Sequence, residues 1–155
     1  MVSKGTTILA GAIAAWLAAV GVGSTTAQES VQKAQESVQK TTTNDGVYTK
    51  AQADAAKAKY DKICAECHAF TVAAKKKPKD LPLGDEPFLE EWQGRTLGEL
   101  VTLIALTMPN DGSAVVTDEE AVELIAYILQ QNGFPAGSKP LTKAGTSTVI
   151  ERPKK

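Results

Sequence analysis

The stretch Cys64-Ala-Glu-Cys-His68 could do chemistry, because it places two thiols and an imidazole within five residues. The sequence contains 2 cysteines and 1 histidine, and all of them lie in this stretch. Two cysteines separated by two residues and followed at once by histidine is the spacing for covalent attachment of a c-type haem. On one helical turn both sulfurs face one porphyrin edge and the next residue projects towards the ring centre. We therefore expect thioethers at Cys64 and Cys67, with His68 under the iron.

Other interpretations of this motif fit the chain less well. A structural zinc site usually has four ligands in two separated pairs, whereas this chain offers three Cys and His groups in one place. A thioredoxin-like dithiol lies near a βαβ pattern, whereas residues 51–63 read as an Ala/Lys-rich helix. A chance match stays open on the pentapeptide alone, so support must come from the rest of the chain.

A methionine is the best candidate for a second iron ligand. Apart from Met1, the only methionine is Met108, forty residues after His68 in the sequence Thr107-Met-Pro. Its thioether is a soft ligand, and His/Met ligation raises the potential of haem iron. The alternative is a methionine that fills a gap in the core. Its place at an expected helix end before a proline favours the ligand.

Composition and the N-terminal residues limit the classes of protein to which the chain can belong. A chain of 155 residues with 43% hydrophobic content allows one domain plus tails, and a formal charge of −1 argues against non-specific nucleic-acid binding. Residues 1–27 combine Lys4, an apolar run over 8–20 and small residues at 25–27, which is typical of a cleaved signal peptide. The run falls short of the roughly 20 apolar residues that span a bilayer. We expect export without stable membrane insertion; a retained anchor is the alternative.

The rest of the chain divides into a spacer, a domain and a tail. Residues 28–46 contain the sequence QESVQK twice, with one valine per seven residues where a coiled coil needs two apolar positions. This segment is interpreted as a polar repeat spacer that ends in the turn sequence Asn44-Asp-Gly. The folded domain is predicted over 47–137, with a C-terminal tail at 138–155.

Helical periodicity and capping signals predict a small all-α domain of three to five short helices. Capping boxes begin at Thr96 and at Thr117, each with a glutamate three residues later. The expected helices are Lys50–Cys64, Pro87–Trp92, Leu97–Leu106 and one from Asp118 to Asn132-Gly133. Because so small a helical domain has a modest core, a buried porphyrin would supply its apolar centre.

At this point the chain resembles the class I monohaem cytochromes c of the bacterial periplasmic type. The likeness covers 47–137 and rests on the CAECH motif, on Trp92-Gln-Gly-Arg-Thr-Leu-Gly-Glu-Leu100, on the Met-Pro pair and on the segments 124–129 and 132–137. It implies that the first and last helices cross, bringing Ala56 and Tyr60 against Tyr127.

The resemblance also implies contacts to the haem. A proline carbonyl of the loop, for which Pro82 is the candidate, would accept the N–H of His68 and tune its basicity. Trp92 and Arg95 would be neighbours of the haem propionates, because indole N–H and guanidinium are donors. A packed tryptophan and a solvated arginine remain the alternatives.

What the resemblance implies for function is a periplasmic one-electron carrier, not an enzyme, with one covalent haem c. Its redox partners would be a periplasmic dehydrogenase or a terminal oxidase. One alternative is a haem-bearing subunit of such a complex, and another is a ligand-binding haem protein with a labile Met108. The lysines at 75, 76, 77 and 79 are interpreted as a solvated loop, with docking of an acidic partner as the alternative.

Overall fold

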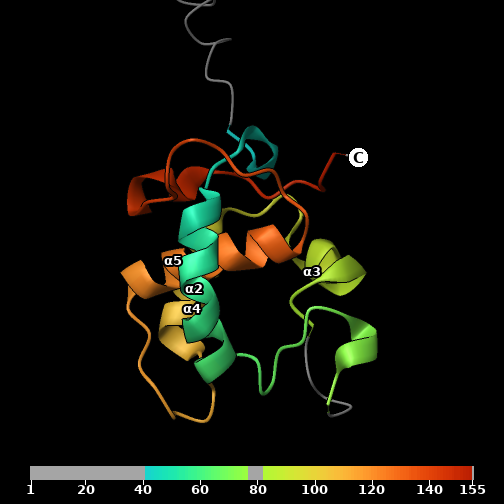
Figure 1. Ribbon diagram of the computed structural model, residues 1–155, viewed down its shortest axis with the longest axis vertical. Helices are drawn as coiled ribbons and strands as arrows, with labels where there is room; N and C mark the ends of the chain where they lie inside the picture. Colours follow the sequence, from blue (N-terminus) through green and yellow to red (C-terminus); the bar gives the residue numbers. More distant parts are fainter. Residues whose placement is uncertain (1–40, 77–81, 155) are drawn as a thin grey trace, which may run out of the picture. The chain divides into compact units, whose positions relative to one another are not determined.

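The computed structural model describes residues 41–76 and 82–154 of the chain (Figure 1). The predicted signal peptide, the repeats at 28–40 and the lysines at 77 and 79 lie outside these residues. The described part contains four α-helices: α2 (Lys50–Ile63), α3 (Asp85–Trp92), α4 (Leu97–Thr107) and α5 (Asp118–Gln131). Three short 3-10 helices accompany them: η1 (Thr43–Asp45), η2 (Val72–Ala74) and η3 (Lys143–Ser147).

These elements confirm the predicted all-α class. Over the described ranges extended backbone pairs only at isolated bridges, where Val149 meets Thr42 and Thr96, and no strand is formed. None of the helices in those ranges has the length and apolar content needed to cross a membrane.

Side-chain caps explain where the helices begin. Thr96 and Thr117 each accept a hydrogen bond from the backbone N–H three residues on, and Glu99 and Glu120 accept one from the threonine's own N–H. Both predicted capping boxes are therefore present, and they satisfy amides that a helix start leaves without partners.

The first and last of these helices pack against each other, as the resemblance implied. Ala53 and Ala56 of α2 are buried and small, so α5 approaches closely (Figure 1). The rings of Tyr60 and Tyr127 lie 5.1 Å apart between centroids, at 58° to each other. This contact joins the end of α2, just before the CAECH motif, to the middle of α5.

The residues after 137 pack onto the helices instead of leaving them. Leu141 and Ile150 are 4% and 0% exposed, and the Thr43 hydroxyl donates to the Glu151 carbonyl at 3.2 Å. A Cβ at Gly137 would lie 1.8 Å from the carbonyl oxygen of Gly46, so the two ends of the predicted domain touch through bare backbone. The packed unit thus extends on both sides of the predicted range 47–137.

Candidate functional site

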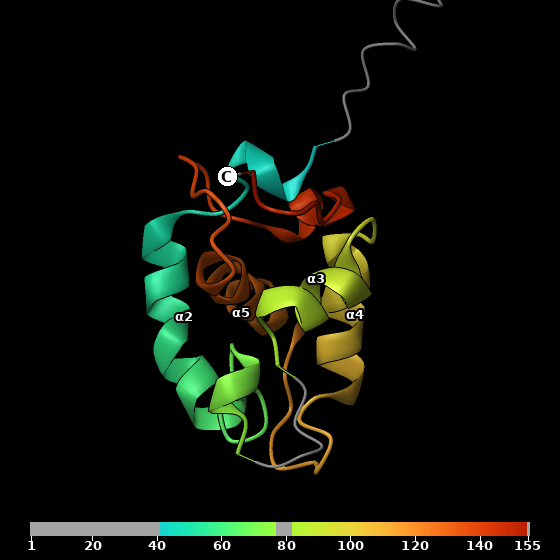
Figure 2. The same ribbon diagram turned by 90° about the vertical axis from the view of Figure 1, so that its right-hand side faces the viewer.

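A cavity of about 340 Å³ lies among α3, α4, α5 and the segment that follows α2. This volume is within the range of roughly 300–1,000 Å³ that ligand sites occupy. Figure 2 shows α2 and its loop on one side and α3 and α4 on the other. The aliphatic and aromatic residues of the lining include Leu83, Pro87, Phe88, Leu100, Leu103, Ile104, Leu124 and Ile128.

The CAECH motif enters this cavity as a turn that continues α2. The Cys64 N–H still donates to the Tyr60 carbonyl at 2.8 Å, and the amides of Cys67 and His68 both donate to the Cys64 carbonyl, at 3.1 and 2.9 Å. This turn puts Cys64 and His68 in the cavity lining. Cys67 is exposed and is not part of the lining.

An aromatic cluster of Tyr60 and Phe70 packs beside the motif and fixes its backbone. The Tyr60 hydroxyl donates to the His68 carbonyl at 2.7 Å, and its ring stacks on Phe70 with 4.8 Å between centroids. Burial raises the pKa of the Tyr60 phenol, so the hydroxyl keeps its proton and remains a donor. The backbone of His68 is therefore tied to α2, and the residue lines the cavity.

Met108 reaches the same cavity from the end of α4. The helix ends at Thr107, and the Met108 N–H makes the last bond of the helical type, to the Ile104 carbonyl at 3.0 Å. Met108 itself is extended, with φ −117° and ψ 143°, because the following Pro109 disfavours helical backbone at this position. The structure thus brings together His68 and Met108, which lie forty residues apart in the sequence. Ligation of iron by this pair stays a prediction.

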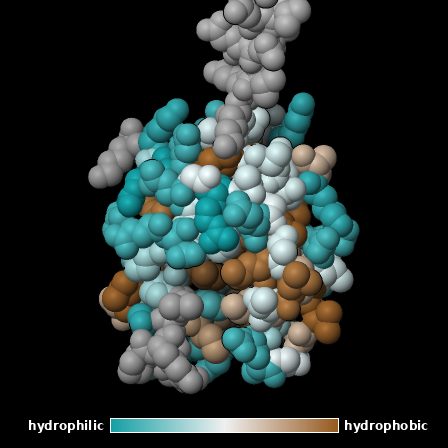
Figure 3. Space-filling model, turned by 180° about the vertical axis from the view of Figure 1, so that it is seen from behind, coloured by the Kyte–Doolittle hydropathy of each residue, from teal (hydrophilic) through white to brown (hydrophobic). Residues whose placement is uncertain are grey.

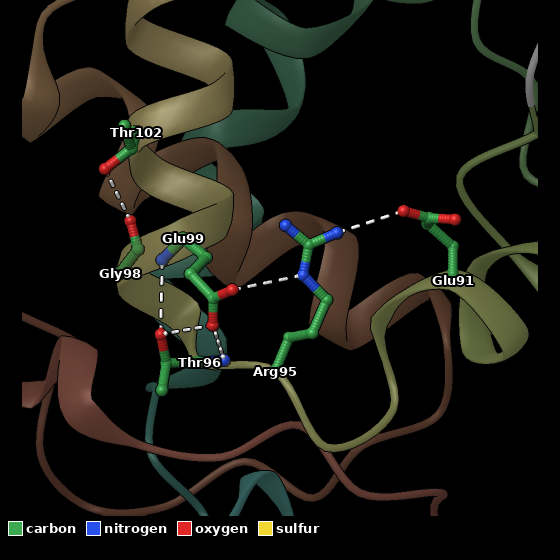
Figure 4. A network of polar contacts seen from close by, with 6 residues as sticks. All are labelled: Glu91, Arg95, Thr96, Gly98, Glu99 and Thr102. Atoms are coloured by element: carbon green, nitrogen blue, oxygen red, sulfur yellow. Dashed lines mark hydrogen bonds and ion pairs between the residues drawn. The ribbon is translucent and has the colours of Figure 1, made fainter.

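Trp92 and Arg95 occupy different places. Trp92, the last residue of α3, is 5% exposed and lines the cavity. Arg95 is outside the lining: its Cζ lies 4.1 Å from the centroid of the Trp92 ring, and its guanidinium pairs with Glu91 at 3.0 Å and with Glu99 at 3.3 Å (Figure 4). Contact of either residue with propionates stays a prediction.

Two further residues belong to the site and were not expected from the sequence. Glu91 joins the lining, and its spacing of four residues from Arg95 was the signal that could have found it. Asn132, at the end of α5, donates to the Leu83 carbonyl at 2.7 Å and so fixes the loop next to Pro82. Pro82 lines the cavity together with His68, and the predicted bond between them stays a prediction.

The chemistry of the lining fits a haem. Burial raises the pKa of the Cys64 thiol to about 11, so this sulfur sits as a neutral group in apolar surroundings, as a thioether would. An imidazole and a thioether are both known axial ligands of haem iron. Apolar residues reach the surface on the face shown in Figure 3, and Leu103, which lines the cavity, is 37% exposed.

Comparison with known proteins gives one match. The family model described as cytochrome c oxidase, cbb3-type, subunit III matches residues 51–128. This range begins in α2 and ends in α5, so it contains the CAECH motif, Trp92 and Met108. Comparison with curated proteins and with solved structures gave no match.

Proposed function

Because the chain belongs to the family of cytochrome c oxidase, cbb3-type, subunit III, we propose that it is an exported one-electron carrier with one covalent haem c. The family is one of cytochrome c domains, whose work is electron transfer through haem. In this proposal Cys64 and Cys67 hold the haem through thioethers. His68 and Met108 would be the residues that hold its iron.

The observation that carries the proposal is the convergence of Cys64, His68 and Met108 on one apolar cavity. When bound, the haem supplies one-electron exchange at its iron. The chain's own residues position the two ligands, exclude water from the apolar lining and leave part of that lining, at Leu103, open to the surface. With His68 and Met108 both holding the iron, no site would remain there for a substrate, which supports a carrier and not an enzyme.

The family match also favours a second candidate, a haem-bearing subunit of an oxidase or a dehydrogenase complex. A free carrier would be released by osmotic shock and run alone on a sizing column. A subunit would stay with the membrane fraction and co-purify in detergent with integral proteins. Mass determination of the same material tests the proposed periplasmic location, since loss of residues 1–27 is expected on export.

Replacement of Met108 tests the ligand set. The ferric wild type is expected to be low-spin with a weak red band from sulfur-to-iron charge transfer, and Met108→Ala should abolish that band. Because thioether ligation favours reduced iron, the variant should also have a lower reduction potential and bind carbon monoxide.

Leu106→Ala is a matched control, because Leu106 is on the same helix, 78% exposed and outside the cavity lining. It should keep the band, the spin state and the potential. An unchanged band and potential in Met108→Ala would contradict the ligand assignment. Carbon monoxide binding by the wild type would instead favour a ligand-binding haem protein with a labile Met108.

A further inference from the structure

Trp92 has a different neighbour on each side. It lines the cavity, whereas the Arg95 guanidinium lies over its ring at 4.1 Å and lines none of the cavity. Cation and ring attract each other in this arrangement, and an arginine also stacks flat on an indole. Arg95 therefore restrains the ring from outside the cavity.

Two carboxylates restrain Arg95 in turn. Its Nη1 lies 3.0 Å from Glu91 of α3 and its Nε lies 3.3 Å from Glu99 of α4, so one side chain joins two helices (Figure 4). Glu99 is itself fixed by the Thr96 amide, which donates to it at 2.8 Å. We name the set Glu91, Arg95 and Glu99 the carboxylate clamp. It carries two negative charges and one positive charge.

One residue of the carboxylate clamp, Glu91, lies in the cavity lining. Its exposed carboxylate pairs with Arg95 beside the cavity. The neighbouring Glu90 is exposed and is not part of the lining. The same helix thus has one glutamate that lines the cavity and one that does not.

We propose that Arg95 is a positioning residue: it holds the Trp92 ring as a cavity wall and keeps the Glu91 carboxylate beside the cavity, where this charge lowers the reduction potential. The inference rests on the proposed function, since it assumes haem in the cavity. Ferric haem carries one more positive charge than ferrous haem, so a nearby carboxylate stabilises the ferric form. An exposed charge acts less at high salt.

The test compares charge-neutralising variants of the full haem-loaded chain by redox titration at low and high salt. Glu91→Gln should raise the potential, and the rise should shrink with salt. Glu90→Gln removes the same charge from the same helix and should raise the potential less. Arg95→Gln leaves two uncompensated carboxylates and should lower the potential.

A second readout follows the ring itself. Trp92 is the one tryptophan of the exported protein, because the sequence has two and the other, Trp16, lies in the expected signal peptide. Arg95→Lys keeps the charge but loses the planar fork and the stacking, so it should change the near-ultraviolet circular dichroism of Trp92 and the dichroism of the haem band. If Arg95 acted through its charge alone, Arg95→Lys would leave both dichroism signals unchanged.

Three outcomes decide the matter. Equal shifts for Glu91→Gln and Glu90→Gln would overturn the inference while leaving the proposed function intact. Dichroism unchanged in Arg95→Lys would overturn the positioning role of Arg95. A wild-type chain that takes up no haem would overturn the proposed function, and the inference with it.

Discussion

The two sides of the cavity are held in different ways. On the histidine side, the end of α2 and its loop, the supports are a hydrogen bond from the buried Tyr60 to the His68 carbonyl and packing of aromatic rings. On the tryptophan side, α3 and α4, the supports are two exposed ion pairs of Arg95 and its contact with Trp92. The first set is shielded from water and the second set is open to it.

This difference predicts different responses to conditions. Exposed ion pairs contribute roughly 0–1 kcal/mol and weaken with salt, whereas burial of an aromatic ring contributes several times more. The histidine side, where we propose that the haem is attached, should therefore stay in a constant place. The tryptophan side is where charge, salt and mutation can adjust the potential without unfolding the domain.

Loss of the proposed haem should have the largest effect, because it would take away the group that both sides are proposed to pack against. Cys64→Ser with Cys67→Ser should give a chain without covalent haem and with reduced helicity, measured by absorption under denaturing conditions and by far-ultraviolet circular dichroism. The physical reason is that the apolar lining would then face water. A haem-free double variant with full helicity would contradict this dependence.

Truncation of the aromatic cluster should have the second-largest effect and should destabilise the histidine side. Tyr60→Ala removes a ring that is 2% exposed, and large-to-small changes of this kind cost about 3–5 kcal/mol. Tyr60→Phe is the matched variant, since it keeps the ring, loses the bond to His68 and should cost only about 1 kcal/mol. Guanidinium unfolding measures both; equal losses would mean that the hydrogen bond and not the packing carries this side.

A methyl group at Gly84 should disturb the place where the two sides meet. Its Cβ would lie 2.0 Å from the Phe70 carbonyl oxygen, so Gly84→Ala must separate the histidine-side loop from the start of α3. We expect a loss of about 1–3 kcal/mol in the free energy of unfolding. Gly145→Ala is the control, because its Cβ would meet only the flexible Leu141 methyl at 3.3 Å, and a loss as large there would remove the explanation.

The smallest expected effect is the pH dependence of the stability that Glu99 contributes on the tryptophan side. Hydrogen bonds, first from the Thr96 backbone, lower the pKa of Glu99 below its usual 4.5. A carboxyl whose folded pKa is lowered stabilises the fold above its unfolded pKa and loses that contribution as the pH falls through its folded pKa. Glu99→Gln should therefore be less stable than wild type at neutral pH. The gap should close below about pH 4.5, as unfolding at a series of pH values would show; a gap that stays constant would point to packing instead.

Local sequence signals were enough to predict much of the fold. The capping boxes at Thr96 and Thr117 and the helical periodicity before the CAECH motif predicted helices that the structure has nearly to the residue. Caps and periodicity act within a few residues, so a sequence displays them directly. The packing of residues 138–154 gave no such signal, because it depends on backbone contacts with 41–46, such as the 2.9 Å bond from the Thr43 amide to the Val149 carbonyl.

For the site, the sequence by itself determined which groups could serve a haem: two thiols, one imidazole and one thioether are all that the chain offers of each beyond Met1. Only the tertiary structure decided where they lie, with His68 and Met108 at one cavity and Cys67 outside its lining. It also placed Trp92 and Glu91 in the cavity lining and Arg95 outside that lining, over the Trp92 ring. Residue type sets the chemistry of a side chain, whereas its position at a cavity depends on how helices distant in sequence pack.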